Sequence, residues 1–393
     1  MSPRARKWFS APIQRIATVV LGGLLAFGNP SNAQSTPGTP PTSATPPAES
    51  TIAKAPPATS GTVVTELDKH ISSVFQAKDG TYWFASRENG VYHFDGKRIV
   101  QYTTAHGLGG NAARGIQEDR AGNIYVGSQP GGVSRFDGRG FRTLPIELHD
   151  PHDPASRGWK LQPDDLWFAA QQDSGAVYRY DGSVVHLLTF PGTKAGADHY
   201  AELPRSEFPN AKYSPYDVYT IFKDSRGHLW FGTATLGVCR FDGKSFAWAH
   251  KTEIGFPAGD GFGVRGLIED RDGKFYFSLT GNRYAAQPDA APGATPNTSK
   301  LALEKEPGVG PRDSISAFVS AIKDKDEHLW FATLGDGVYR YDGKETTHYP
   351  VTNDGAPIWI YSIYRDAKDG LWVCTQGAGV YKFNGKAFEK FRP

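Results

Sequence analysis

Cysteine is nearly absent from this sequence, which has only Cys239 and Cys374 among 393 residues. The two fall in widely separated copies of a repeated segment, so no disulfide bond is expected between them. Both are predicted to be small buried residues. The fold must therefore hold together without a covalent cross-link.

Long apolar runs are also scarce. The run near the N-terminus, residues 16–27, has twelve residues and is too short to span a bilayer comfortably. Basic residues precede it and Ser31-Asn32-Ala33 follows it, a pattern typical of a secretory signal peptide cleaved after Ala33. We therefore predict a signal peptide over residues 1–33, a periplasmic or secreted protein, and no stable membrane insertion after cleavage.

Neither sign of charge dominates. The net charge is +2 for the whole chain and −2 without residues 1–33, which hold four basic and no acidic residues. Such a balance does not favour nucleic acid or an anionic membrane as a partner. Standard catalytic signatures are missing too: there is no G-x-S-x-G, H-E-x-x-H or C-x-x-C motif and no glycine-rich phosphate loop.

Aromatic residues and glycine are abundant, with 23 Phe, 18 Tyr, 9 Trp and 45 Gly. A segment like L-W-F-G-T, usually followed by G-V-x-R-F-D-G-K, recurs seven times with a base period of 42 residues. This period is typical of a β-propeller with one four-stranded blade per repeat. We predict an all-β, seven-bladed β-propeller of four-stranded blades over residues 63–393. Its central aromatic residues are Trp83, Tyr125, Trp167, Trp230, Tyr276, Trp330 and Trp372.

Residues 34–62, between the predicted signal peptide and the first repeat, are mostly Pro, Ser, Thr and Ala. They cannot bury enough apolar surface to offset their ordering entropy, so a disordered linker is predicted. Two repeats depart from the pattern: the third has a shortened first turn, and the fifth has an insertion over residues 287–299 before its outer strand. Residues 63–67 are a candidate closing strand for the last blade.

The repeated unit is clearest at Asp224–Lys244, Asp324–Lys344 and Asp366–Lys386. It resembles the two-component regulator propeller repeat. In that family such repeats usually form the periplasmic sensor part of membrane histidine kinases and are associated with detecting extracellular carbohydrates. The resemblance implies ligand binding, and we expect a stand-alone propeller without a kinase.

One position of the repeat suggests a site. In the six repeats that align cleanly, the residues eleven positions before the central aromatic residue are Ser72, Arg114, Tyr219, Arg265, Val319 and Tyr361. Residues at one position of a pseudo-symmetric ring face a shared axis or shared interfaces. The two arginines and two tyrosines, with Trp359 and Tyr216 as stacking partners, are predicted to bind a polar or anionic ligand at the channel mouth. The alternative is that they satisfy backbone carbonyl groups between blades.

Two long connections add further candidates. Residues 147–158 include His149, His152 and Asp153, and imidazole with carboxylate suits a divalent metal ion. A solvated polar loop is the alternative. Residues 191–215 mix aromatic and charged side chains that suit a sugar, as ordinary surface loops also do: His199, Tyr200, Glu202 and Arg205.

The leading hypothesis is an exported, non-catalytic module that binds a small molecule, such as a carbohydrate, or a protein partner. No organic cofactor is expected, with a divalent metal ion as the alternative. A second hypothesis is a propeller enzyme of the streptogramin-lyase type, which would need a positioned base and a metal ion or cationic group. No His–Glu pair stands out at matching repeat positions, so an enzyme is disfavoured. A third hypothesis is a scaffold for protein interactions.

Overall fold

The computed structural model describes residues 60–149, 158–170, 174–202, 214–256, 263–287, 298–308, 315 and 317–393. The expected signal peptide and all but the last three residues of the expected linker lie outside these ranges. Residues 58–393 form one compact unit. In the described part of the chain, no helix combines the length and the apolar character that a membrane span requires.

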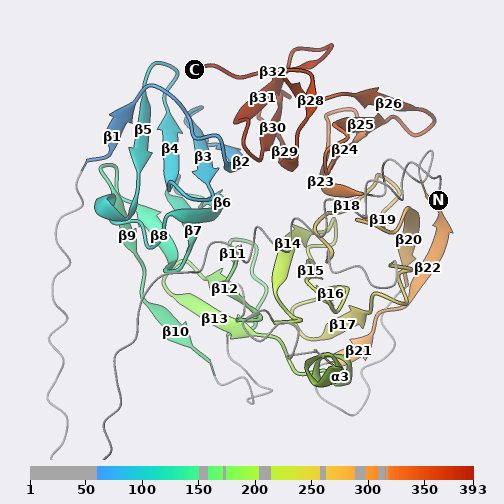
Figure 1. Cartoon of the computed structure of the whole chain (residues 1–393). Coiled ribbons are helices and arrows are strands. Elements are labelled where there is room, and N and C mark those ends of the chain that lie inside the picture. Colours follow the sequence, from blue (N-terminus) through green and yellow to red (C-terminus); the bar gives the residue numbers. More distant parts are fainter. Residues whose placement is uncertain are drawn as a thin grey trace, which may run out of the picture. The chain divides into compact units, whose positions relative to one another are not determined.

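The unit is a seven-bladed β-propeller, as predicted, and its blades follow one another around a ring (Figure 1). Neighbouring blades touch through their innermost strands. Blades 1 and 2 are β2 (Ile71–Gln76), β3 (Tyr82–Ser86), β4 (Val91–Phe94), β5 (Ile99–Tyr102), then β6 (Ala112–Glu118), β7 (Ile124–Gln129), β8 (Gly132–Phe136), β9 (Phe141–Thr143). Blade 4 is β14 (Val218–Lys223), β15 (Leu229–Thr233), β16 (Val238–Phe241), β17 (Phe246–Ala249).

The second half of the ring is built in the same way. Blade 5 is β18 (Leu267–Glu269), β19 (Phe275–Phe277), β20 (Asn282–Ala286), β22 (Leu303–Pro307). Blade 6 is β23 (Phe318–Lys323), β24 (Leu329–Thr333), β25 (Val338–Tyr341), β26 (Thr346–Tyr349). Blade 7 is β29 (Ile360–Arg365), β30 (Leu371–Thr375), β31 (Val380–Phe383), β32 (Phe388–Lys390). The hairpin β27 (Thr352–Asn353) and β28 (Ala356–Pro357) joins blades 6 and 7.

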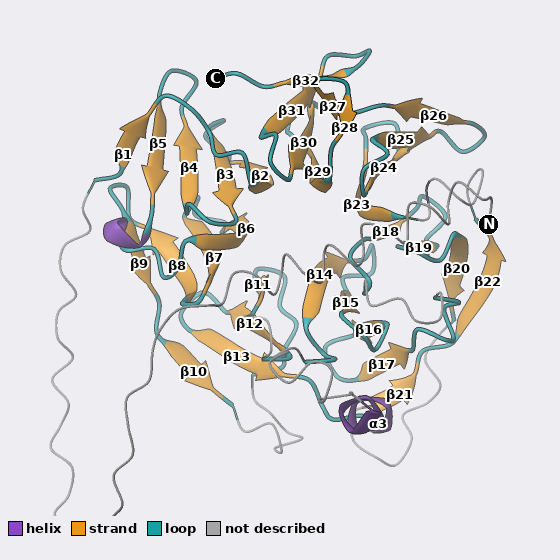
Figure 2. Ribbon diagram, in the orientation of Figure 1, coloured by secondary structure: helices purple, strands orange, loops and turns teal. Residues whose placement is uncertain are grey.

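Blade 3 departs from the four-stranded pattern. Its described antiparallel strands are β11 (Leu166–Ala169), β12 (Ala176–Tyr180) and β13 (Val185–Thr189), and the shorter β10 (Ile146–Leu148) pairs in parallel with β13 on the outer side. The strand that carries the central Trp167, β11, is therefore the innermost one described, and it contacts β6 and β14. Among the helices with described bounds, η1 (Thr104–His106) follows β5 and α3 (Lys194–Glu202) follows β13 (Figure 2).

Extra strands also widen blades 1 and 4. The strand β1 (Thr62–Val64) pairs with β5, so this segment extends the first blade and does not close the last one. The insertion of blade 5 does lie before its outer strand, as predicted. It contributes β21 (Thr298–Lys300), which pairs in parallel with β17 of blade 4. The expected insertion over residues 287–299 would let the outer strand of blade 5 begin at Lys300. The strand itself begins three residues later, at Leu303.

The aspartate at the first turn of the repeat anchors blades 4, 6 and 7. In blade 7, Oδ1 of Asp366 accepts hydrogen bonds from the amides of Lys368 and Gly370 at 3.0 and 2.7 Å, and Oδ2 accepts the indole N–H of Trp372 at 2.9 Å. The same indole bond joins Trp230 to Asp224 and Trp330 to Asp324. One carboxylate thus fixes the turn and the rotamer of the central tryptophan, because a buried N–H must find an acceptor.

A second set of hydrogen bonds connects four of these turns to the next blade. The amide that follows the turn aspartate position is donated to a side chain of the neighbouring blade in four joints. The pairs are Lys78 to Glu118 at 3.0 Å, Ser225 to Glu269 at 2.7 Å, Lys325 to Asp369 at 3.2 Å and Ala367 to Gln76 at 2.9 Å. Glu118 and Glu269 therefore have structural roles, because each accepts a backbone amide from the preceding blade.

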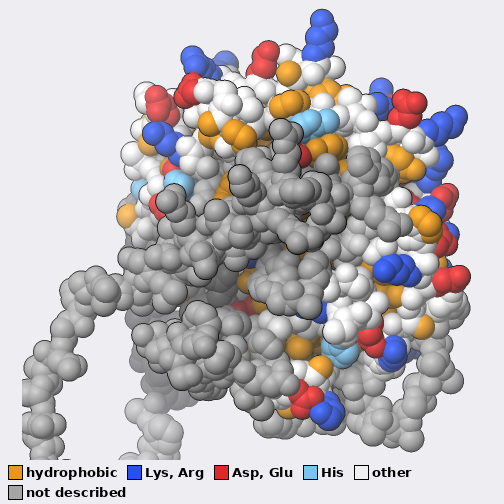
Figure 3. Space-filling model, turned by 45° about the vertical axis from the view of Figure 1, so that its right-hand side comes forward, with side chains coloured by type: hydrophobic (Ala, Val, Ile, Leu, Met, Phe, Trp, Pro, Cys, Tyr) orange, Lys and Arg blue, Asp and Glu red, His pale blue; other side chains and the backbone are white. Residues whose placement is uncertain are grey.

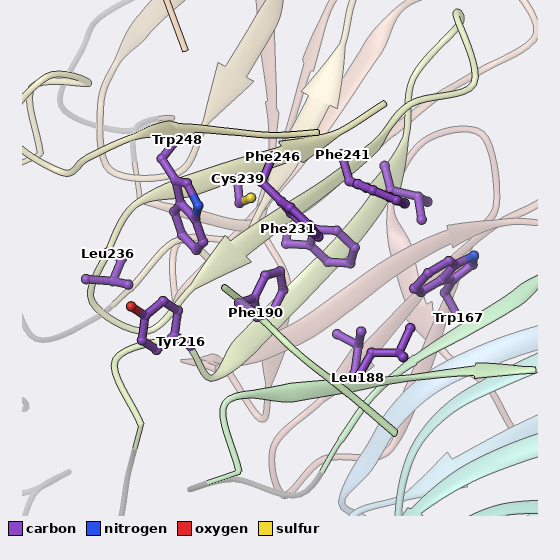
Figure 4. Packing of buried hydrophobic residues seen from close by; sticks show 12 residues of the cluster. Trp167, Leu188, Phe190, Tyr216, Phe231, Leu236, Cys239, Phe241, Phe246 and Trp248 are labelled. Carbon is purple, nitrogen blue, oxygen red and sulfur yellow. The ribbon is translucent and has the colours of Figure 1, made fainter. Parts of the chain in front are cut away.

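The apolar core is divided among the joints between blades. The described buried residues form seven clusters, and each cluster lies between two neighbouring blades. Figure 4 shows the cluster between blades 3 and 4, where Phe190 packs against Phe231 and Trp248. Both cysteines are buried and free, as expected. Cys239 belongs to this cluster, and Cys374 lies in the cluster between blades 7 and 1.

The joint between blades 7 and 1 closes the ring without exchange of a strand. Tyr82 of β3 donates its hydroxyl to Oδ2 of Asp366 at 2.9 Å, and its ring lies 5.0 Å from that of Trp372. The equivalent position in the other blades is apolar: Ile124, Leu166, Leu229, Phe275, Leu329 and Leu371. Phe391, just after the last strand, stacks on Phe84 of blade 1. The amides of Gly377 and Gly379 also bond the carbonyl of Lys69, at 3.0 and 2.9 Å. Among the described residues, these bonds and the side-chain contacts therefore hold the joint in place of a shared strand.

Replacing Tyr82 with Phe removes only the hydroxyl that reaches Asp366. A hydrogen bond to a charged group contributes about 1.5–3 kcal/mol, so we expect the free energy of unfolding to fall by about 2 kcal/mol. Equilibrium urea unfolding measures this change. Tyr341→Phe is the matched control, because no described residue bonds the Tyr341 hydroxyl, and it should leave stability within about 0.5 kcal/mol. Equal effects of the two variants would contradict this account of closure.

The turn aspartates predict a specific loss of stability in acid. Burial alone would raise the pKa of Asp324 and Asp366, but the hydrogen bonds from Trp330 and Trp372 and from the turn amides outweigh it and hold both pKa values below the usual range. A carboxyl group with a depressed folded pKa stabilises the fold above its unfolded pKa of about 3.9, and this contribution disappears as pH falls through the folded value. Urea midpoints at pH 7, 4 and 3 should fall steeply only below about pH 4. Asp324→Asn should flatten that dependence, and an unchanged slope would refute the assignment.

Candidate functional site

A β-bulge occurs at one repeat position in five of the seven blades. In blade 4 the register passes from Val218 opposite Thr233 to Thr220 opposite Gly232, so Tyr219 is the extra residue. The same one-residue shift occurs in blades 1, 2, 6 and 7 at Ser72, Arg114, Val319 and Tyr361. A bulge turns the extra side chain out of the regular alternation of the strand. These residues are the ones that the sequence placed eleven positions before the central aromatic residue.

Five side chains from five blades come together at the end of the ring where these bulges lie. Arg87 of blade 1 lies over the ring of Tyr361 of blade 7, with 4.6 Å from its Cζ atom to the ring centroid. Arg265 of blade 5 lies over Tyr219 of blade 4 at 4.3 Å. Arg114 of blade 2 lies close enough that the charges of Arg87 and Arg265 both act on it. We call Arg87, Arg114, Tyr219, Arg265 and Tyr361 the axial cluster.

The cluster concentrates positive charge in partly buried surroundings. Burial and the charges of Arg87 and Arg265 lower the pKa of Arg114 to about 10. Burial likewise lowers the pKa of Arg87. Among the described residues, no carboxylate forms an ion pair with either of these two arginines. Nη2 of Arg114 bonds Oε1 of Gln129 at 3.2 Å, whereas its buried Nε has no partner in the described part of the chain.

The backbone of neighbouring blades makes room for these side chains. Gly263 has φ of 73°, and a Cβ atom added there would lie 2.7 Å from the ring of Tyr219. Glycine therefore allows the chain to pass beneath Tyr219 in the left-handed conformation. Ser72, at the same repeat position, instead donates its hydroxyl to the carbonyl groups of Ala85 and Ala113, both at 3.1 Å. Ser72 thus satisfies backbone carbonyl groups between blades, whereas the larger side chains at this position form the cluster.

Of the two expected stacking residues, Tyr216 lies in the core and Trp359 lies at a joint between blades. Tyr216 is buried between blades 3 and 4, stacks on Phe190, and accepts the amide N–H of Thr193 at 2.7 Å (Figure 4). It is a core residue and does not belong to the axial cluster. Trp359 is partly exposed at the joint of blades 6 and 7, where it forms a β-bridge with Leu334 and its carbonyl accepts the amide of Gln376 at 2.8 Å.

The connection candidates are only partly described. His199, Tyr200 and Glu202 lie in α3, so part of the expected loop over residues 191–215 is helical, and their side chains are outside the description. Arg205, His152 and Asp153 also lie outside the described residues. His149 is described, and it lies beside Glu147 and His186 at the outer edge of blade 3. This edge is separate from the axial cluster.

Arg87 was not predicted from the sequence. It lies four residues after the central Trp83, in the turn between β3 and β4, where its amide bonds the carbonyl of His70 at 3.0 Å. The equivalent residue of blade 2 is Gln129, which bonds Arg114. A second alignment at this position would have found both side chains. On the face drawn in Figure 3, exposed acidic and basic side chains are interspersed.

Comparison with protein families gives a match to the two component regulator propeller over residues 212–235. These residues include β14 and β15, with the bulge at Tyr219 and the bond between Asp224 and Trp230. The chain carries a two component regulator propeller repeat. This match confirms the family resemblance expected from the sequence. A comparison with curated proteins gives no match.

Solved structures with the same fold come from several kinds of protein. The extracellular domain of a putative hybrid two component system from B. thetaiotaomicron has a TM-score of 0.51 and 16% identity, over 82% of this chain and 39% of that domain. Virginiamycin B lyase from Staphylococcus aureus has a TM-score of 0.54 and 14% identity, over 82% and 97%. YCF48 from Cyanidioschyzon merolae has a TM-score of 0.50 and 14% identity, over 83% and 96%. The chain thus spans about two fifths of the sensor domain, and likeness at these identities shows the fold alone.

The crowded arginines predict a gain in stability when one is removed. A base whose folded pKa lies below its unfolded value destabilises the fold as long as it is protonated. With the pKa of Arg114 at about 10, Arg114→Met should raise the free energy of unfolding at pH 7 by about 1–2 kcal/mol, allowing for the lost bond to Gln129. The control is Arg139→Met, at an exposed hairpin of the same blade, which should change stability by less than about 0.5 kcal/mol. Urea unfolding that shows Arg114→Met to be destabilising would contradict this view of the cluster.

Proposed function

We propose that this propeller is an exported, non-catalytic binding module whose axial cluster takes an anionic ligand. The observation that carries the proposal is the convergence of Arg87, Arg114 and Arg265 from three blades, although mutual repulsion makes that arrangement costly. Strained or mutually repelling charged groups of this kind are typical of functional sites, where stability is given up for binding. An anion placed between the guanidinium groups would relieve the repulsion.

The geometry of the donors suits a carboxylate or a sulfate group. A guanidinium group presents a planar fork that binds such groups through two parallel hydrogen bonds. The Nε of Arg114 still lacks a described partner, so it is available for one of these bonds. The stacked tyrosines Tyr219 and Tyr361 hold two of the arginines in place through cation–π contacts, which reduces the entropy that binding would cost.

Acidic oligosaccharides are the ligand class that we favour. The two component regulator propeller family is associated with detecting carbohydrates outside the cell. Uronic acids and sulfated sugars carry the negative charge that would complement the arginines of the axial cluster. Export through an N-terminal signal would place the propeller where such ligands occur. A protein partner with an acidic segment remains the second candidate, because loops at the end of a propeller ring also suit protein recognition.

Binding of an acidic sugar can be separated from binding of sugars in general. Isothermal titration with a uronic-acid disaccharide and with a neutral disaccharide of the same linkage should give binding for the acidic sugar only. Arg114→Met and Arg87→Met should each weaken binding by about 10–100-fold, since a hydrogen bond to a charged group contributes about 1.5–3 kcal/mol. Raising the salt concentration should also weaken binding, because part of the attraction is screened.

The exposed Arg139→Met serves as the control and should bind as the unmodified chain does. If acidic and neutral sugars bind alike, and the cluster variants bind as well as the unmodified chain, the axial cluster is not the binding site. Conversion of the ligand during the titration, seen as new products by mass spectrometry, would move the function to the lyase class.

A further inference from the structure

Three potential metal ligands meet at the outer edge of blade 3, away from the axial cluster. The parallel pairing of β10 with β13 places Glu147 directly opposite His186, and His149 follows at the end of β10. Nε2 of His149 lies 2.8 Å from Nδ1 of His186. The Glu147 carboxylate lies 3.9 Å from His149 Nε2 and 3.6 Å from His186 Nδ1. All three ligand atoms therefore face one another across a common point.

A carboxylate behind His186 fixes the orientation of its ring. Nε2 of His186 lies 3.0 Å from Oδ2 of Asp181, whose Oδ1 accepts the amides of Ser183 and Val184, both at 2.9 Å. A carboxylate can only accept, so Nε2 of His186 carries the hydrogen and Nδ1 turns its lone pair towards Glu147 and His149. This arrangement, in which a carboxylate orients a histidine towards a ligand, is the usual surrounding of a metal-binding histidine.

We propose that Glu147, His149 and His186 bind a divalent transition-metal ion of the zinc class, with Asp181 as the positioning residue for His186. Two imidazole nitrogens and one carboxylate oxygen suit such ions and do not suit Ca²⁺ or Mg²⁺, which prefer oxygen ligands. Tetrahedral geometry with Zn–N distances of about 2.0–2.1 Å requires the two nitrogens to separate to about 3.3 Å. His149 can supply that shift, because it lies beyond the end of β10 and makes no ladder hydrogen bond there.

The surroundings of the three ligands favour an ion. The side chains of His149 and His186 are only 12% and 11% exposed, whereas that of Glu147 is 55% exposed and leaves a path from solvent. The charge of Arg179 also acts on His149, but its guanidinium is already paired with Asp165 at 2.7 and 3.1 Å. The bound ion would tie the segment that leaves blade 2 to the outer strand of blade 3.

A second cluster of the described chain provides an internal contrast. Asp324, Asp326 and His328 also converge in blade 6. There, however, Nη2 of Arg340 lies 2.8 Å from Nδ1 of His328, and Oδ2 of Asp324 already accepts the indole of Trp330. A permanent cation occupies the place that a metal ion would need, so no metal is expected at this cluster.

Calorimetric titration of the purified chain, without a polyhistidine tag and freed of metal by a chelator, tests the proposal. ZnCl₂ should bind with one high-affinity site per chain and raise the melting temperature, whereas MgCl₂ and CaCl₂ should do neither. His149→Ala and His186→Ala should abolish this site. His328→Ala, the matched control from blade 6, should bind zinc as the unmodified chain does.

Two milder variants keep the test decisive if a histidine variant does not fold. Glu147→Gln changes a mostly exposed side chain and should weaken zinc binding at least tenfold. Asp181→Asn should weaken it by about 10–100-fold, the usual effect of losing an orienting carboxylate. The proposal is overturned if the unmodified chain binds no zinc, if both milder variants bind as tightly as it does, or if His328→Ala removes the site.

Discussion

The hydrogen bond between a buried turn aspartate and the indole of the central tryptophan underlies the rest of this propeller. At Asp224, Asp324 and Asp366 the same carboxylate also binds the amides of its own turn. The turn, the second strand and the largest side chain of the blade therefore share one electrostatic anchor. Because the tryptophan packs in the cluster between its own blade and a neighbour, the anchor also sets how adjacent blades face each other. A blade that lost it would disturb the joint beside it as well as itself.

The repeat made the architecture predictable, because a constant spacing of aspartate, aromatic residue and glycine reports a constant backbone. The exceptions come from segments that the repeat does not govern. The chain attaches Thr62–Val64 to blade 1, Ile146–Leu148 to blade 3 and Thr298–Lys300 to blade 4 as added outer strands. Such pairings depend on which exposed sheet edge a long connection can reach, and local sequence does not encode that choice.

The candidate sites also combine residues that the repeat predicts with residues that it does not. Arg114, Tyr219 and Tyr361 could be found by alignment because a bulge repeats at their position. Arg87 lies at another repeat position, and His186 lies 37 residues from His149, so single-position reasoning missed both. Tyr216 was misplaced because an aromatic residue just before an inner strand can turn either to the axis or to the joint between blades. In this structure Tyr216 packs against Phe190 and Trp248 in the joint.

Closure of the ring without an exchanged strand has a consequence for the connectivity of the fold. In the part of the chain that the structure describes, no blade takes a strand from the opposite end of the propeller sequence. The joint between blades 7 and 1 is held by side chains such as Tyr82 and Phe391 and by the backbone bonds of Gly377 and Gly379 to Lys69. The chain crosses the other six joints covalently, so this joint is the single break in an otherwise circular peptide. Topologically the break could lie at any joint, and a permuted chain that linked blade 7 to blade 1 would transfer it to the joint chosen for the new ends. The fold is thus a closed cycle of seven blades, and the order in which the chain visits them is one of seven that the same cycle allows.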